Sequence, residues 1–257
     1  MDFIINGING KMGRMILESL SREDDAAVLC GFDKQPATAG NEVRFRGVSI
    51  PVFDQPSAFT GKADVIIDFS HYTAVPDLLR YAVLTGTPAV ICTTALGEAE
   101  RDLLREASLK IPVFNSSNMS LGINIIAKMC KLAMPALESN FNVEIIEKHH
   151  TQKIDSPSGT AILLADAVNE ACEVKKDYLY GRHSKHDECK LTDLGIHAVR
   201  GGTLPGQHTV LFAGSDETIE ITHTAYSRSV FAQGAIKAAY YIAGKKPGFY
   251  TMDDVIA

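Results

Sequence analysis

The N-terminal segment constrains the fold most strongly, because a strand, a glycine turn and a helix follow one another directly. Residues 3–6 predict a short buried strand because residues 3–5 are apolar, and residues 7–13 carry glycine at every third position. A second apolar strand at 27–32 ends at Asp33, about twenty residues after the last glycine, where a dinucleotide-binding βαβ unit carries its ribose-binding acid. Asn9 stands where the usual fingerprint has its second glycine. An ordinary βαβ unit with closely packed glycines is therefore the alternative.

Alternating strand and helix patterns continue beyond this unit. Strand patterns at 64–68, 88–92 and 111–114 are separated by helical patterns at 75–84 and 98–109. This alternation predicts an α/β fold with a Rossmann-like parallel sheet, in which ligands bind at the carboxyl ends of the strands. The segments at those ends are polar or small and are predicted to line a cofactor crevice; they are residues 68–71, 92–94 and 115–118.

The pair Asp33 and Lys34 leaves the choice of nucleotide open. An acid at this strand end bonds the ribose 2′-hydroxyl of NAD, whereas a neighbouring cation can meet the 2′-phosphate of NADP. Because the two residues point to different cofactors, the sequence predicts NADH, NADPH or both.

After Met119 the pattern changes from alternating elements to strands in succession. A helix is expected from Met119 to about Glu138, interrupted near Pro135, and a second one at 160–171. The strands expected here would form a mixed or antiparallel sheet; they lie at 143–146, 194–199, 208–213 and 218–224. We predict a central α+β domain, 119–227, inserted in a dinucleotide-binding domain made of 1–118 and 228–257.

Residues 147–160 gather two imidazoles, an ammonium group and a helix start. If residues 143–155 are extended, His149, Thr151 and Lys153 project from one face and His150 from the other. Ser158, Gly159 and Thr160 then lead into a helix, and the free backbone N–H groups at its start could bind an anion. The pattern predicts a pocket for a small carboxylate that needs a proton during its reaction. The alternative is a pair of partly buried strand histidines beside a solvated lysine.

Composition limits the possible partners. The net charge of −6 disfavours nucleic acid, so a small dianion would need a local positive site. No apolar run is long enough to span a membrane, and the N-terminus lacks a secretory signal, so we expect a cytoplasmic protein. Five widely spaced cysteines fit reduced thiols. The spacing His183, His186, Cys189 resembles a metal motif but lacks a second ligand cluster, so a solvated loop and no metal are predicted.

Taken together, these motifs resemble the 4-hydroxy-tetrahydrodipicolinate reductase family, also called dihydrodipicolinate reductase, of the lysine and diaminopimelate pathway. Residues 147–160 match the family signature E-x-H-H-x-x-K-x-D-x-P-S-G-T at every fixed position. The resemblance runs nearly end to end; its other elements are residues 7–14, 68–70, 93–94, 118–124, 200–202 with Gly206 and His208, and 220–228.

The resemblance implies a reductase that transfers hydride from NADH or NADPH to a cyclic dicarboxylate, usually as a homotetramer built through the central sheet. It implies that His149 is a general acid or base and that Lys153 is a proton donor or carboxylate partner. His150, Ser158, Gly159 and Thr160 would hold the dicarboxylate. The predicted cofactor-binding residues are Gly7, Ile8, Asn9, Gly10, Lys11, Met12, Asp33, Lys34, Phe69, Ser70, Cys92, Thr93, Thr94, Ser116, Ser117, Asn118 and Met119.

The chain departs from the family pattern at two points. Cys92 and Ala95 replace glycines of a G-T-T-G loop, and residues 115–118 are more polar than usual, so cofactor affinity or preference could differ. Two other functions remain open. One is a related dehydrogenase acting on another dicarboxylate, and the other is a nucleotide-sensing protein without catalysis. Oxidation of NADH with the cyclic substrate distinguishes both from the reductase.

Overall fold

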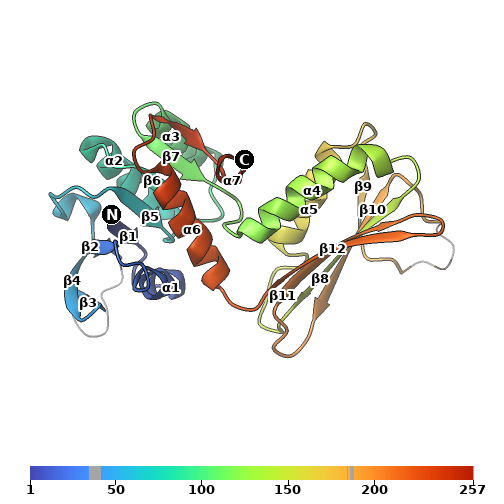
Figure 1. The fold of residues 1–257 in the computed structure, drawn as a ribbon, viewed down its shortest axis with the longest axis horizontal. Helices are drawn as coiled ribbons and strands as arrows, with labels where there is room; N and C mark the ends of the chain where they lie inside the picture. The colour runs from blue at the N-terminus through green and yellow to red at the C-terminus, as the bar shows by residue number, and fades with distance from the viewer. Residues whose placement is uncertain (35–41, 184, 186–187, 257) are drawn as a thin grey trace. The chain divides into compact units, whose positions relative to one another are not determined.

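The computed structural model describes residues 1–34, 42–183, 185 and 188–256. The chain divides into two compact units (Figure 1). The first comprises Met1–Leu121 and Arg228–Ala257, and the second comprises Gly122–Ser227. We call them the cofactor unit and the substrate unit after the roles that the sequence predicts for them. No helix among the described residues is long and apolar enough to cross a membrane. His186, part of the metal-like spacing, lies outside the described residues.

The cofactor unit is built on an eight-stranded sheet. Its strands are β1 Asp2–Asn6, β2 Ala27–Phe32, β3 Glu42–Phe45, β4 Val48–Phe53, β5 Val65–Asp68, β6 Ala89–Ile91, β7 Pro112–Asn115 and β13 Gly248–Tyr250. They lie in the order β13-β7-β6-β5-β1-β2-β4-β3, and all neighbours are parallel except β3 and β4. The chain order reverses direction between β1 and β5, which is where ligands bind in open α/β sheets. The Rossmann-like fold class is confirmed.

Helices cover both faces of this sheet. They are α1 Lys11–Leu20, α2 Val75–Thr85, α3 Glu98–Ser108, α6 Ser229–Ile242 and α7 Met252–Val255, with short 3₁₀ turns η1 Pro56–Ala58 and η2 Tyr72–Ala74. Because strand side chains alternate, Phe3 and Ile5 pack with α1 and α6, whereas Ile4 packs with α2 and α3. The C-terminal α6 therefore completes a core that begins with the first strand.

Three strands of this unit were not predicted. The hairpin of β3 and β4 has mostly exposed side chains, so apolar residues do not mark it clearly. Strand β13 has only three residues and is partly exposed, and it adds to the sheet by pairing with β7. Strands β4 and β13 join the sheet by pairing with β2 and β7, which are distant in sequence, and a local pattern does not reveal such pairing.

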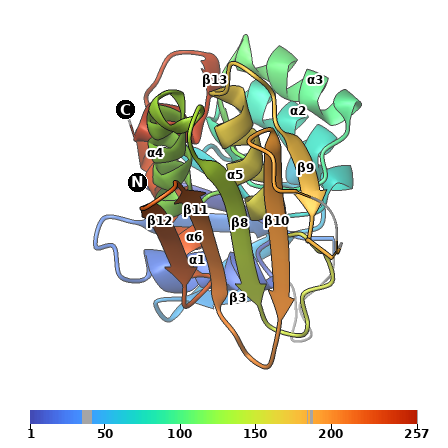
Figure 2. The same ribbon diagram turned by 90° about the vertical axis from the view of Figure 1, so that its right-hand side faces the viewer.

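The substrate unit contains a five-stranded mixed sheet. Its strands are β8 Asn142–His149, β9 Asp177–Tyr180, β10 Asp193–Arg200, β11 Gly206–Ala213 and β12 Thr218–Ala225. The order is β12-β11-β8-β10-β9, with β11 antiparallel to both neighbours (Figure 2). Helices α4 Leu121–Leu137 and α5 Gly159–Glu170 pack on one face through a shared apolar core. The mixed α+β sheet predicted for this region is confirmed.

Local details of the substrate unit differ from the sequence prediction. Strand β8 ends at His149 instead of continuing to residue 155, because Lys153 N–H bonds His150 O in a turn and Thr151 N–H bonds Gly202 O. Helix α4 runs without a break through Pro135, near its end. Strand β9 lies in a segment that was predicted only as polar. His149 and His150 consequently need not alternate across one regular strand.

Candidate active site

The glycine turn joins β1 to α1 in a conformation that needs glycine. Gly7 has φ of 78°, and its N–H bonds Phe32 O at 2.8 Å. A Cβ on Gly7 would lie 2.6 Å from the carbonyl oxygen of Phe69, so a side chain would push the turn away from β5. Gly10 caps α1, where predicted residues Lys11 and Met12 begin the helix. Ile8 is fully buried in the core, and Asn9 N–H bonds Asp33 Oδ2 at 3.0 Å.

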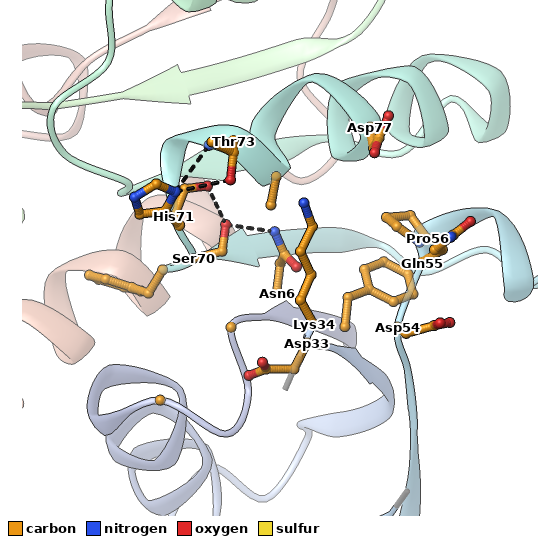
Figure 3. A pocket seen from close by; sticks show the side chains of 15 residues that line it. Asn6, Asp33, Lys34, Asp54, Gln55, Pro56, Ser70, His71, Thr73 and Asp77 are labelled. Carbon is orange, nitrogen blue, oxygen red and sulfur yellow. Dashed lines mark hydrogen bonds between the residues drawn. The ribbon is translucent and has the colours of Figure 1, made fainter. Parts of the chain in front are cut away.

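A pocket of about 490 Å³ opens beside this turn (Figure 3). Ser70 connects the residues of one wall, because its Oγ accepts a hydrogen bond from Asn6 Nδ2 at 3.0 Å and donates one to His71 O at 3.3 Å. Lys34 extends into the pocket from the end of β2. Pockets that enclose small ligands have volumes of about 300–1,000 Å³. Six predicted cofactor residues line it: Gly7, Gly10, Asp33, Lys34, Phe69 and Ser70.

A second pocket of about 540 Å³ lies at the ends of β6 and β7. Four predicted cofactor residues line it, namely Thr93, Thr94, Ser116 and Ser117. Cys92, Asn118 and Met119 are buried and are not among the described residues that line either pocket. Ala95, at a position where the family has glycine, takes φ of 59°. That left-handed conformation explains the preference for glycine there.

A fully buried carboxylate, Asp68, connects three neighbouring strand ends. It accepts hydrogen bonds from Asn6 Nδ2 at 2.7 Å, Thr93 Oγ1 at 2.6 Å and Ser70 N–H at 3.1 Å. Burial raises the pKa of Asp68, and the three neutral donors offset this only in part. The cluster holds the two segments that follow β5 and β6 in place.

In the substrate unit, His149 is held by a second fully buried carboxylate, Glu147. His149 Nδ1 lies 2.6 Å from Glu147 Oε2, and the His149 side chain is 12% exposed. Burial lowers the pKa of His149, Glu147 opposes that effect, and the charges of Lys153 and Arg200 lower it further. The net shift is downward, so His149 is neutral at physiological pH until a ligand changes its surroundings.

Arg200 forms a bidentate ion pair with the same carboxylate. Its two terminal nitrogens lie 2.6 and 2.7 Å from the oxygens of Glu147, and Ser158 N–H donates to Glu147 Oε1 at 3.0 Å. Burial alone would raise the pKa of Glu147, but the hydrogen bonds from Arg200, His149 and Ser158 outweigh it and lower the pKa. Glu147 is therefore ionised.

The N-terminus of α5 lies next to this network. Ser158 caps the helix by accepting from Ala161 N–H at 3.1 Å, and open space surrounds Gly159. The Asp155 carboxylate accepts a hydrogen bond from Lys153 Nζ at 2.8 Å and another from Gly159 N–H. Burial would raise the pKa of Asp155, but these two partners lower it. The helix start was predicted to offer free N–H groups. Instead, Asp155 already occupies part of the position expected for an anion.

Two further histidines lie nearby, His208 buried and His150 half-buried. Ser158 Oγ lies 2.8 Å from His208 Nε2, and the rings of His208 and His149 meet edge to face with centroids 5.1 Å apart. Burial lowers the pKa of His208 to about 3, so this ring is neutral. His150 follows the end of β8, and its Nδ1 is buried without a hydrogen bond to any described residue.

The structure thus brings His149, Lys153, Ser158 and Gly159 to one end of the substrate unit, with Thr160 in the first turn of α5. Sequence reasoning assigned no role to Glu147 or Asp155, nor to Arg200. The spacing of Glu147 and His149 by two residues on a strand could have placed them on one face. Arg200 could not be found in this way, because it meets His149 only through the register of β10 on β8.

The fold and these two sites define a class of protein: a nicotinamide-dependent oxidoreductase with an inserted α+β substrate unit. Family models described as dihydrodipicolinate reductase, N-terminus, and dihydrodipicolinate reductase, C-terminus, match residues 1–119 and 122–256. The chain belongs to the dihydrodipicolinate reductase family, as its motifs predicted.

Similar proteins agree over the full length. A 4-hydroxy-tetrahydrodipicolinate reductase of Caldanaerobacter subterraneus subsp. tengcongensis is 45% identical, covering 98% of this chain and 97% of the relative. One from Clostridium botulinum is 44% identical, over 98% and 97% of the two chains. A dipicolinate-bound dihydrodipicolinate reductase from Paenisporosarcina sp. TG-14 has the same fold, with a TM-score of 0.81 and 23% identity over 99% and 98% of the chains.

Proposed function

We propose that this chain reduces 4-hydroxy-tetrahydrodipicolinate to tetrahydrodipicolinate, with NAD(P)H, in lysine and diaminopimelate biosynthesis. Family membership supports the reaction, since the curated relatives carry the name of this reductase. The observation that carries the assignment to specific residues is the cluster of His149, Lys153 and the α5 N-terminus. It offers a proton and a cation to one anionic ligand, which would take the place of Asp155 at the helix start.

The cofactor unit provides for NAD(P)H, which supplies the hydride when bound. The tight turn at Gly7 lets the backbone approach a pyrophosphate, and the N-terminus of α1 favours its negative charge. Asp33 and Lys34 line the same pocket and would meet the adenosine ribose. Thr93 and Ser116 belong to the second pocket, which we assign to the nicotinamide end. We propose residues 1–118 and 228–257 as the dinucleotide-binding domain.

The substrate unit would hold the dicarboxylate and complete the reaction with a proton. One carboxylate would lie at Ser158, Gly159 and Thr160, where the helix start favours anions. Lys153 would pair with it in place of Asp155. Hydride addition to the conjugated ring leaves an enamine-like anion, and His149 would protonate it from Nε2. His150 would also help to hold the dicarboxylate. We propose residues 119–227 as the substrate-binding domain.

The decisive experiment replaces His149 with Gln. A positioned general acid contributes about a hundredfold to ten-thousandfold in rate, so kcat should fall by that factor while the Kd for NADH stays unchanged. His183→Gln is a matched control, because His183 is an exposed histidine of the same unit. Normal turnover with weakened NADH binding would contradict the assignment. If the wild-type protein fails to oxidise NADH with the cyclic substrate, a nucleotide-sensing role becomes the better explanation.

We propose that both NADH and NADPH are used, since Asp33 suits one and Lys34 the other. Steady-state assays with each nucleotide test this directly. Lys34→Ala should raise KM for NADPH by about tenfold, the effect of losing one charge-assisted hydrogen bond, and should leave KM for NADH within about twofold. An equal loss for both nucleotides would show that Lys34 does not contact the 2′-phosphate.

We also propose a homotetramer that assembles through the substrate unit's sheet. On the face opposite the core, Ile146 and Leu211 are half-buried and Val199 is 42% exposed, although all three are apolar. Light scattering should give the mass of four chains, and a monomer would contradict the proposal.

We also propose a cytoplasmic location, which five unpaired thiols support.

A further inference from the structure

Glu147 is a fully buried side chain next to the proposed proton donor, and the mechanism above gives it no task. Its carboxylate has no exposed surface, yet it accepts four hydrogen bonds. Oε2 receives His149 and one nitrogen of Arg200, while Oε1 receives the other nitrogen and Ser158 N–H. A buried ion pair needs further hydrogen bonds to its remaining lone pairs, and here these come from His149 and from the start of α5.

The first consequence concerns the tautomer of His149. Ionised Glu147 has no proton to donate, so at the 2.6 Å contact His149 Nδ1 must be the donor. Nε2 is then the nitrogen left to carry or release a proton. A Cβ on Gly206 would lie 3.2 Å from Nε2, so glycine at this position leaves room beside that atom.

The second consequence concerns the loop between β8 and α5. Arg200 Nη2 bonds the carbonyl oxygen of Asp155 at 2.7 Å, and Glu147 bonds the N–H of Ser158 at the helix start. The Glu147–Arg200 pair therefore fixes the segment that leads from Lys153 into the carboxylate-binding turn. One buried carboxylate contacts both the proton donor and the structure that holds the substrate.

We propose that Glu147 is the positioning residue of this enzyme, fixing His149 with Nε2 outward and fixing the α5 N-terminus at the same time. The proposal rests on His149 being the proton donor. In the reaction, the Nε2–H bond of the imidazolium breaks and the new C–H bond of the product forms. Glu147 keeps its charge throughout, and solvent returns a proton to Nε2. Its charge stabilises the imidazolium that must exist before each proton transfer.

A double-mutant cycle separates this role from a merely structural one. Glu147→Gln should lower kcat by about a hundredfold, the lower end of what a general acid contributes, with an unchanged Kd for NADH. In the His149→Gln background the same substitution should change kcat by less than about twofold, because Glu147 would have no donor left to position. The second task, holding the α5 N-terminus, should still appear in that background as a higher KM for the dicarboxylate. An equal loss in both backgrounds would overturn the proposal.

Glu144 provides a matched control on the same strand. It also pairs with an arginine and a histidine, Arg182 at 2.7 Å and His197 at 2.6 Å, and it projects from the opposite face of β8. Glu144→Gln should therefore leave kcat per chain unchanged. A hundredfold loss in this variant would mean that any broken ion pair on β8 disables the enzyme.

The pH profile gives a second test. The charged and titratable groups facing His149 are Glu147, Lys153, Arg200 and His208. Because His149 must be protonated to donate, kcat falls as pH rises through the pKa of His149. Glu147→Gln removes an effect that raises this pKa and should move the basic limb to lower pH. Arg200→Gln removes a positive charge that lowers the pKa of His149, so it should move the basic limb to higher pH. A uniform loss without displacement would overturn the proposal.

A measurement on the wild-type protein avoids any failure of the variants to fold. In protein labelled with ¹⁵N-histidine, neutral His149 should carry its proton on Nδ1, with the signal assigned by its loss in His149→Gln. A neutral tautomer protonated on Nε2 would overturn the proposal. If His149→Gln itself turns over normally, the proposed function fails instead, and the two failures are thus distinguishable.

Discussion

The two units each bury a carboxylate completely, but they give it opposite surroundings. In the cofactor unit, Asp68 receives only neutral donors, and burial raises its pKa. In the substrate unit, Glu147 receives a guanidinium and an imidazole, and its pKa is lowered despite the same burial. Burial alone therefore does not set the charge of a carboxylate, and its partners decide it.

This contrast follows the task of each unit. The cofactor unit shapes its pocket with backbone conformation, as Gly7 and Ala95 show by their positive φ angles. The substrate unit relies on charged side chains, which suits the proposed dianion, because on a chain of net charge −6 a dianion would need local cations. We expect substitutions of charge to be most harmful in the substrate unit, and substitutions that change backbone freedom to matter in the cofactor unit.

The largest effect is expected for Glu147→Gln. Removing one partner of a buried ion pair leaves Arg200 uncompensated, so the free energy of unfolding should fall by about 3 kcal/mol. Denaturant unfolding measures the loss, and the partly exposed pair of Glu144 should cost less than about 1 kcal/mol in the matched variant. Equal losses would remove the distinction between the buried and the exposed network.

The pH dependence of stability should differ in sign between the two carboxylates. Because the pKa of Glu147 is depressed, its stabilisation is present above its ordinary value of 4.5 and is lost as pH falls through the folded-state value. The deficit of Glu147→Gln should therefore shrink in acid. For Asp68 the pKa is raised, so its stabilisation is present below 3.8 and is lost as pH rises. The free energy of unfolding of wild type relative to Asp68→Asn should therefore fall as pH rises above 3.8, opposite to the trend for Glu147.

At neutral pH, Asp68→Asn should cost only about 1 kcal/mol or less. The remaining oxygen can still accept from Asn6 and Ser70, and the new amide can donate to Thr93. Thr93 can then give its proton to Ser70 O, which already lies 3.2 Å away. Denaturant unfolding and the Kd for NADH test this. A loss as large as that of Glu147→Gln would show that Asp68 acts as a charge after all.

The smallest effect is expected for Ala95→Gly. Glycine adopts the φ of 59° without the strain that Ala95 bears, so the free energy of unfolding should rise by about 0.5 kcal/mol. Ala99→Gly in α3 is the control, because glycine inside a helix should instead cost about 1 kcal/mol. Thermal unfolding of both variants measures these changes. A larger loss of stability in Ala95→Gly than in Ala99→Gly would contradict the prediction.

The sequence predicted features that depend on neighbouring residues. The glycine turn, the alternating elements and the helix start at Ser158 are local patterns, and motif resemblance gave the family. Strand β8 ends at His149 because Thr151 N–H bonds Gly202 O and Gly201 N–H bonds His149 O. Both hydrogen bonds join residues that are far apart in the sequence. The pairing of Glu147 with Arg200 likewise needs the register of β10. Such contacts depend on strand pairing and do not appear in any local pattern.

The insertion of the substrate unit has a consequence for how the chain is made. Helix α6 and strand β13, which complete the core and the sheet begun by β1, leave the ribosome after every strand of the inserted unit. Because domains fold as units, the substrate unit can fold as soon as its own strands are made. The cofactor unit cannot complete its fold until the end of the chain is made. Nascent chains halted after Ser227 should therefore protect β8 to β12 from proteolysis while failing to retain NADH.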